Sequence, residues 1–168
     1  MLDIPAFAYQ EEKERPVKVS LLCWDIANPL LEKHVQIHHD IEQVESLRLT
    51  YNWESTINFK KLIAENHTIV ITNLAQEIVW VSHSFEAMTG YGSEEATGKI
   101  PSFLQGKKTN PQIKALIREK LAKLENIETK ILNYRKNGES YWCSIKIFPI
   151  QNAKGEVTHY IAIEKEIN

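Results

Sequence analysis

The chain has 168 residues, of which 43% are hydrophobic and 25% charged, and its formal net charge is −2 at pH 7. This composition is typical of a folded globular protein and argues against extensive disorder. The small net charge gives no global reason to expect nucleic acid or an anionic membrane as a partner. No apolar run approaches the roughly 20 residues that a membrane-spanning helix needs.

The N-terminal segment MLDIPAFAYQEEKERP lacks a basic stretch followed by an apolar one, so we expect no secretory signal. The two cysteines, Cys23 and Cys143, are too few for a disulfide framework. We therefore expect a cytoplasmic protein with free thiols and no membrane partner.

Residues 1–65 form a predicted N-terminal extension. Residues 1–17 are charged and contain prolines, so we expect them to be extended or mobile. Asn28 followed by Pro29 is typical of a helix start. Apolar residues then recur at three- to four-residue steps with one longer gap, which predicts an amphipathic helix that dimerises or covers a sheet: Leu30, Ile37, Ile41, Val44 and Leu47. A second, short helix is expected over residues 58–65.

From His67 onward the pattern changes to short strands. TIVITN and EIVWVS are rich in β-forming residues and are separated by a turn. Glycine-interrupted helical turns follow, and then TNPQIKALIREKLAKL, whose capping Asn110 and Pro111 predict a longer helix.

Three further strands are predicted, over residues 127–135, 140–150 and 156–167. The first two flank Asn137-Gly138, a strong hairpin signal. Two strands, short helices, one longer helix and three strands predict an α+β fold. We expect a five-stranded antiparallel sheet with its helices grouped on one side.

Three separated segments resemble the PAS family of sensory domains in the right order: NHTIVITNLAQEIVWVSHSFEAMTGYGSEEATGK, NYRKNGESYW and PIQNAKGEVTHYIAIEKEI. The resemblance implies a PAS domain over residues 66–168. SFLQG and TNPQIKALIR are further similar to the light-oxygen-voltage (LOV) subgroup, which holds FMN. GKIP equally resembles PAS domains in which no photochemical cysteine is expected.

The resemblance also implies which residues line a ligand cavity. Gln105 and Asn133 match LOV residues that contact the flavin ring, and Arg118 matches one of two phosphate-binding arginines. Pro101 stands where the adduct-forming cysteine is expected, which excludes a cysteinyl–flavin bond there. Four further positions depart from the LOV pattern: Ile100, Ser102, Cys143 and Glu164. The expected ligand-contacting set is Pro101, Gln105, Arg118, Asn133, Cys143, Ala162 and Glu164.

Three functions stay open on this sequence. The first is a non-enzymatic PAS sensory module that binds a small ligand or a partner protein. The second is a cysteine-less flavin photoreceptor or redox sensor, with Trp80, Trp142 and Tyr160 as candidate electron donors. The third is a ligand-free structural adaptor. No catalytic set suggests an enzyme.

Haem and metal ions are not expected. The helix over residues 110–124 contains no histidine that could serve as an axial haem ligand. His34 and His38 lie four residues apart on one helix face, but a matched third metal ligand is missing. A solvated helix surface explains these histidines more simply.

The outer face of the predicted sheet is apolar, which usually marks an interface. We expect the chain to form a homodimer through this face. Because the sequence runs only one residue past its last predicted strand, we also expect a separate effector protein, unless the chain is a piece of a longer protein. The expected interface residues are Ile37, Ile41, Val44, Trp142, Ile161 and Ile163.

Overall fold

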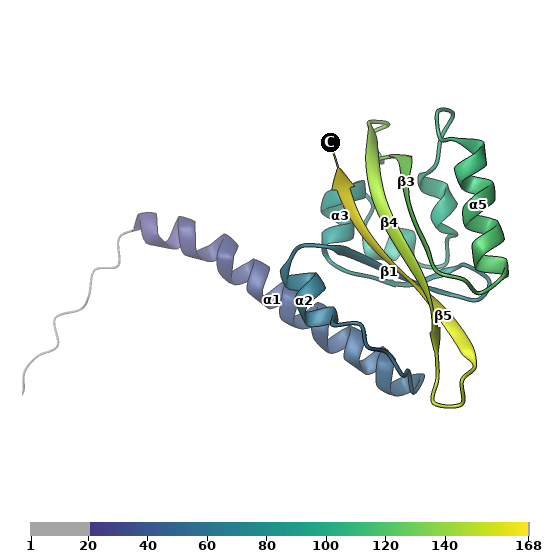
Figure 1. Ribbon diagram of the computed structural model, residues 1–168. Coiled ribbons are helices and arrows are strands. Elements are labelled where there is room, and N and C mark those ends of the chain that lie inside the picture. Colours follow the sequence, from purple (N-terminus) through teal and green to yellow (C-terminus); the bar gives the residue numbers. More distant parts are fainter. Residues whose placement is uncertain (1–20, 168) are drawn as a thin grey trace, which may run out of the picture. The chain divides into compact units, whose positions relative to one another are not determined.

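The computed structural model describes residues 21–167, with side chains from Asn28 onward (Figure 1). The extended or mobile conformation expected for residues 1–17 lies outside this range. The elements in chain order are α1 (Leu21–Thr50), α2 (Phe59–Ala64), β1 (Thr68–Asn73), β2 (Ile78–Val81), α3 (Ser84–Thr89), α4 (Ser93–Ala96), the 3-10 turn η1 (Pro101–Leu104), α5 (Pro111–Ala122), β3 (Ile127–Tyr134), β4 (Ser140–Gln151) and β5 (Val157–Ile167).

Helix α1 begins earlier than the sequence predicted. It starts at Leu21 and contains Pro29 in its interior, so the predicted start at Asn28 is wrong. An interior proline removes one backbone hydrogen bond and its ring crowds the carbonyl four residues earlier, which is why the sequence favoured the first turn for Pro29. The chain divides into two units at Lys33/His34, inside this helix. The second unit, residues 34–168, contains the sheet and the other helices.

All five strands pair antiparallel in the order β2-β1-β5-β4-β3, which confirms the predicted α+β fold with a five-stranded sheet. The β3–β4 hairpin pairs Ile127 with Ile147 at one end and Tyr134 with Ser140 at the other. Its turn contains the predicted Asn137-Gly138, and Gly138 has a φ of +87°, which glycine adopts without strain. The strand order makes β5 the centre of the sheet (Figure 1).

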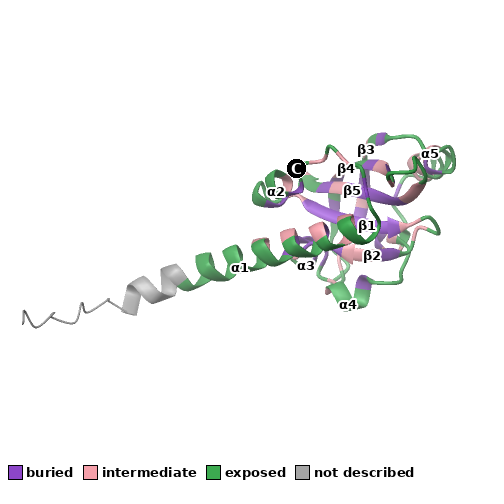
Figure 2. Cartoon of the chain, turned by 90° about the horizontal axis from the view of Figure 1, so that it is seen from below, coloured by how far each residue is buried: buried purple, intermediate pink, exposed green. Residues whose placement is uncertain are grey.

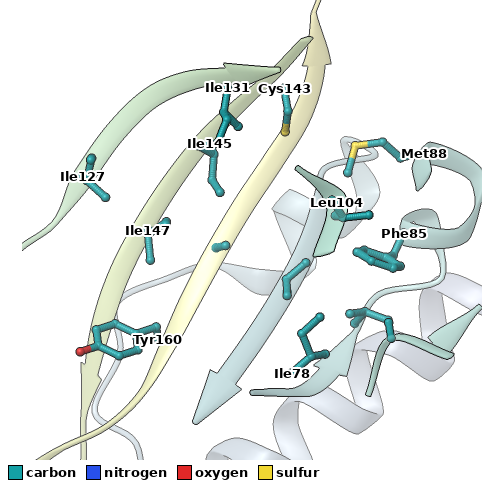
Figure 3. Packing of buried hydrophobic residues seen from close by; sticks show 14 of the residues in the cluster. Ile78, Phe85, Met88, Leu104, Ile127, Ile131, Cys143, Ile145, Ile147 and Tyr160 are labelled. Carbon is teal, nitrogen blue, oxygen red and sulfur yellow. The ribbon is translucent and has the colours of Figure 1, made fainter. Parts of the chain in front are cut away.

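The inner face of the sheet packs against the helices that follow β2. Figure 3 shows Ile131, Ile145 and Cys143 projecting from the strands, with Leu104 and Phe85 among the side chains that close the same core. This core draws residues from α3, α4, η1 and α5, so the predicted grouping of helices on one side is confirmed for the segment between β2 and β3.

The outer face of the sheet packs against the second half of α1 and against α2. Val44 of α1 and Ile161 of β5 are fully buried in this second core, and Ile37, Ile41 and Ile163 pack against it. In Figure 2 the buried colour is concentrated in the strands. Five of the six expected interface residues therefore pack together within one chain, and only Trp142 stays well exposed, at 49%.

Polar contacts fix α1 to the end of β2. Asp40 is buried, and its carboxylate accepts hydrogen bonds from the backbone N–H of His83 at 3.0 and 3.2 Å and from the His83 ring. One turn further along α1, the indole N–H of Trp80 donates to Gln43 at 2.6 Å. These contacts add directional hydrogen bonds to the apolar packing of α1 on the sheet.

Candidate functional site

A cavity of about 360 Å³ lies on the inner face of the sheet, between the strands and the segment that contains η1 and α5. Its volume is in the range of small-molecule sites in proteins. Six of the seven predicted ligand-contacting residues line it: Pro101, Gln105, Arg118, Asn133, Ala162 and Glu164. Cys143 is fully buried beside the cavity, but it is not one of the lining residues.

The loop after η1 is attached to strand β3. Gln105 forms an isolated β-bridge with Asn133. The hydroxyl of Thr109 donates to the carbonyl of Leu132 at 2.6 Å and accepts the N–H of Gly106 at 2.9 Å. These bonds place the Gln105 and Asn133 side chains at the same end of the cavity.

Gly106 allows this loop to approach the sheet closely. A Cβ atom at this position would lie 2.3 Å from the ring of Tyr134, closer than any non-bonded carbon contact. The Tyr134 hydroxyl in turn accepts the backbone N–H of Lys108 at 3.2 Å. The sequence does not reveal this contact, because residues 106 and 134 belong to different elements.

Helix α5 contributes two cations to the cavity. Asn110 accepts the N–H of Gln112 at 2.8 Å, and Pro111 occupies the first turn, so the helix begins where the sequence predicted. Lys114 and Arg118 lie four residues apart, on one face of the helix, and both line the cavity. Neither forms an ion pair with a carboxylate in the described part of the chain. Sequence reasoning found Arg118 but missed Lys114, although the spacing of four residues was visible.

The strands and the loop after η1 contribute uncharged polar groups and one carboxyl to the cavity. Asn133 is only 5% exposed. The side-chain oxygen of Gln105 is buried and has no hydrogen-bond partner among the described residues, so an acceptor is available beside the cavity. The Glu164 carboxyl is 3% exposed, and burial raises its pKa to about 7.

Cys143 is the hydrogen-bond partner of Glu164 among the described residues. Its sulfur lies 3.7 Å from Oε2 of Glu164. Burial, followed by the nearby Glu164 charge, strongly raises the pKa of the Cys143 thiol. A thiol with a raised pKa is a poor nucleophile, so Cys143 serves as a core residue.

The three aromatic residues predicted as electron donors differ in their placement. Tyr160 lines the cavity, and its hydroxyl donates to the carbonyl of Leu121 at 2.8 Å, which ties β5 to α5. Trp80 packs with the outer core, and Trp142 alternates with the inward-facing Cys143 along β4. Only Tyr160 of the three predicted electron donors therefore reaches the cavity.

Neither a metal centre nor a membrane span is found in the described residues. No group of three or more His, Cys, Asp or Glu side chains in this part of the chain could hold a metal ion. No helix within it is long and apolar enough to cross a membrane.

The chain is similar to proteins named for light sensing. Blue-light-activated histidine kinases of Brucella anthropi and Brucella ovis are each 33% identical over 90 residues, which is 54% of this chain and 18% of the relative. The chain thus spans less than one fifth of these curated relatives.

Solved structures of LOV domains are also similar to this chain. The LOV domain of the blue-light-activated histidine kinase of Erythrobacter litoralis EL346 matches with a TM-score of 0.58 and 27% identity, over 61% of this chain and 96% of that one. A LOV domain studied with a flavin analogue matches with a TM-score of 0.62 and 29% identity, over 66% and 84%. Residues 66–168, more than half of the chain, match the PAS domain family. The chain belongs to the PAS domain family, in its LOV-like subgroup.

Proposed function

We propose that this chain is a non-enzymatic sensory module whose PAS cavity binds a flavin. The observation that carries the proposal is the composition of the cavity, which has apolar walls, amide and carboxyl groups from the strands and the η1 loop, and two cations from α5. A ligand that matches it has a flat ring with donors and acceptors on one edge and an anionic tail.

The isoalloxazine ring of a flavin satisfies the first requirement. Asn133 and Gln105 would hold its polar edge, because amides supply both donors and acceptors. The unused oxygen of Gln105 offers an acceptor for a ring N–H. Ile117, Ile145 and Ile147 would contact the faces of the ring.

Lys114 and Arg118 would hold the phosphate of FMN. A phosphate carries more than one negative charge at neutral pH, and two cations on one helix face, without carboxylate partners in the described residues, suit it. Lys114 would supply the second cation beside Arg118.

Bound flavin absorbs blue light and accepts electrons, and the residues around it decide the subsequent chemistry. Neither Cys23 nor Cys143 lies in the loop of residues 98–106, where Pro101 occupies the expected adduct position. We therefore propose a sensor without a cysteinyl–flavin adduct.

The output of the module would pass through contacts between proteins. The similar region of the blue-light-activated histidine kinases is a small part of those proteins. By analogy, we propose that residues 66–168 are the sensory domain and that residues 1–65 carry the response to a partner copy or an effector.

The test is the absorption spectrum of the purified full chain, before and after addition of FMN. We expect flavin absorption that persists through gel filtration and FMN in the material released on denaturation. The double variant Lys114→Ala/Arg118→Ala should weaken FMN binding by about tenfold or more and leave riboflavin binding unchanged, because riboflavin lacks the phosphate. A colourless protein that binds neither flavin would contradict the proposal and favour the structural adaptor.

A further inference from the structure

Glu164 is a buried carboxyl at a ligand cavity, and it has no cationic partner among the described residues. In the sheet it pairs with Thr68 of β1 on one side and Ile145 of β4 on the other. Its hydrogen-bond partner in this part of the chain is the thiol of Cys143. A buried carboxyl at this position can exchange its proton with solvent only through the cavity.

No group that faces Glu164 in the described residues carries a positive charge, and the hydrogen bond from the Cys143 thiol favours the ionised form but does not outweigh burial. From β4, Cys143 and Tyr141 are both uncharged, because burial raises the pKa of each. From β1, the Thr68 hydroxyl donates to Ser84. From β3 and the loop before α5, the cavity receives the neutral amides Asn133 and Gln105.

The cations of α5 do not compensate for the burial of Glu164. Lys114 and Arg118 line the same cavity, but neither is among the causes that set the pKa of Glu164. Burial dominates, and the Cys143 hydrogen bond opposes it only in part. The uncharged form of Glu164 is therefore accessible near neutral pH.

We propose that Glu164 couples occupancy of the cavity to a proton, so that the cavity binds a ligand with an acceptor edge when Glu164 is protonated and releases it when Glu164 is ionised. This inference rests on the proposed function, because it requires that the cavity holds a ligand. A protonated carboxyl donates one hydrogen bond, whereas a carboxylate only accepts. A ring carbonyl or ring nitrogen would be satisfied by the first and repelled by the second.

The proton balance is simple. When an acceptor ligand binds above neutral pH, one proton moves from solvent to a carboxylate oxygen of Glu164. When the ligand leaves, the proton returns to solvent. No other bond forms or breaks. The proton linkage depends on the carboxyl of Glu164 alone.

The first experiment needs no ligand. The side-chain carboxyl carbons of ¹³C-labelled glutamates are followed by NMR from about pH 5 to about pH 9, and Glu164→Gln assigns the signal of Glu164. We expect Glu164 to titrate near neutral pH, well above the ordinary glutamate value of 4.5. A Glu164 signal that is ionised over the whole range would overturn the proposal.

The second experiment measures riboflavin affinity at about pH 6 and about pH 8 for the wild type, Glu164→Gln and the surface control Glu94→Gln. Riboflavin is the probe because the phosphate of FMN itself titrates near pH 6. The dissociation constant of the wild type should rise about tenfold per pH unit above neutral, as one linked proton requires. Glu94→Gln should follow the wild type, and Glu164→Gln should bind equally at both values.

The outcomes of these binding measurements distinguish the proton coupling from the proposed flavin site. Riboflavin affinity that does not depend on pH in the wild type would overturn the coupling and leave the proposed flavin site intact. Absence of binding by riboflavin and FMN in every variant at both pH values would overturn the flavin site, and the coupling with it.

Discussion

At the scale of single residues, the close contact between Gly106 and Tyr134 decides how tightly the cavity loop is held. Gly106→Ala should destabilise the protein by about 1–3 kcal/mol, because the added methyl group overlaps an aromatic ring. Thermal or urea unfolding measures this change. Gly92→Ala is the matched control, since its Cβ would meet nothing closer than 3.9 Å, and it should cost less than about 1 kcal/mol. Equal stability of the two variants would show that the loop moves away from Tyr134 without a loss of stability.

Glu164 should also make the stability of the protein depend on pH. Its folded pKa, about 7, lies above the ordinary value of 4.5 for a glutamate. Its contribution is therefore fully present below about pH 4.5 and is lost as the pH rises through 7, by up to about 3 kcal/mol. Chemical unfolding at several pH values should show this loss in the wild type relative to Glu164→Gln. If the free energy of unfolding depends on pH in the same way for both proteins, then Glu164 is ionised in the folded protein at little cost.

At the scale of elements, the Asp40–His83 contact holds α1 against the junction of β2 and α3. Asp40→Ala should cost about 1–3 kcal/mol, because it removes hydrogen bonds to a buried carboxylate. Hydrogen exchange over residues 34–50 should accelerate at the same time. Glu42→Ala, in the same helix, removes only an exposed contact with His38 and should change stability by about 0.5 kcal/mol or less. If both variants keep wild-type exchange, then the apolar contacts of α1 suffice to hold it.

At the scale of the whole molecule, Trp142 marks the part of the outer sheet face that the second half of α1 does not bury. We expect the full chain to be a homodimer and Trp142→Glu to be a monomer, because a charge at a buried apolar contact is costly. Gel filtration with light scattering measures the mass. Leu74→Glu is the control, since Leu74 is exposed to a similar degree, in the turn between β1 and β2. A monomeric wild type, or a dimer that survives Trp142→Glu, would contradict this expectation.

The fold was largely predictable from the sequence, because its signals are local. Residues of high β-propensity mark the strands, Asn137-Gly138 marks the hairpin, and Asn110-Pro111 marks the start of α5. The start of α1 was not predictable, because proline is favoured in the first turn of a helix and disfavoured in the interior, where Pro29 lies.

The cavity was predictable in part, because strand alternation places Ala162 and Glu164 on one face of β5, and the resemblance to the PAS family implied that Asn133 of β3 faces the same cavity. Contacts between distant segments were not predictable. The approach of Gly106 to Tyr134 and the pairing of Asp40 with His83 depend on how the elements pack, and no periodic pattern in the sequence records them.

The central position of β5 has a consequence for how the protein is made. β1 and β4 both pair with this last strand, so on the ribosome neither has its full set of neighbours until β5 has emerged. Such pairing between distant segments slows folding and leaves apolar edges open to aggregation in the meantime. Early termination before residue 157 would remove the strand that carries Tyr160, Ala162 and Glu164, and would leave two unpaired edges where the finished sheet has its middle.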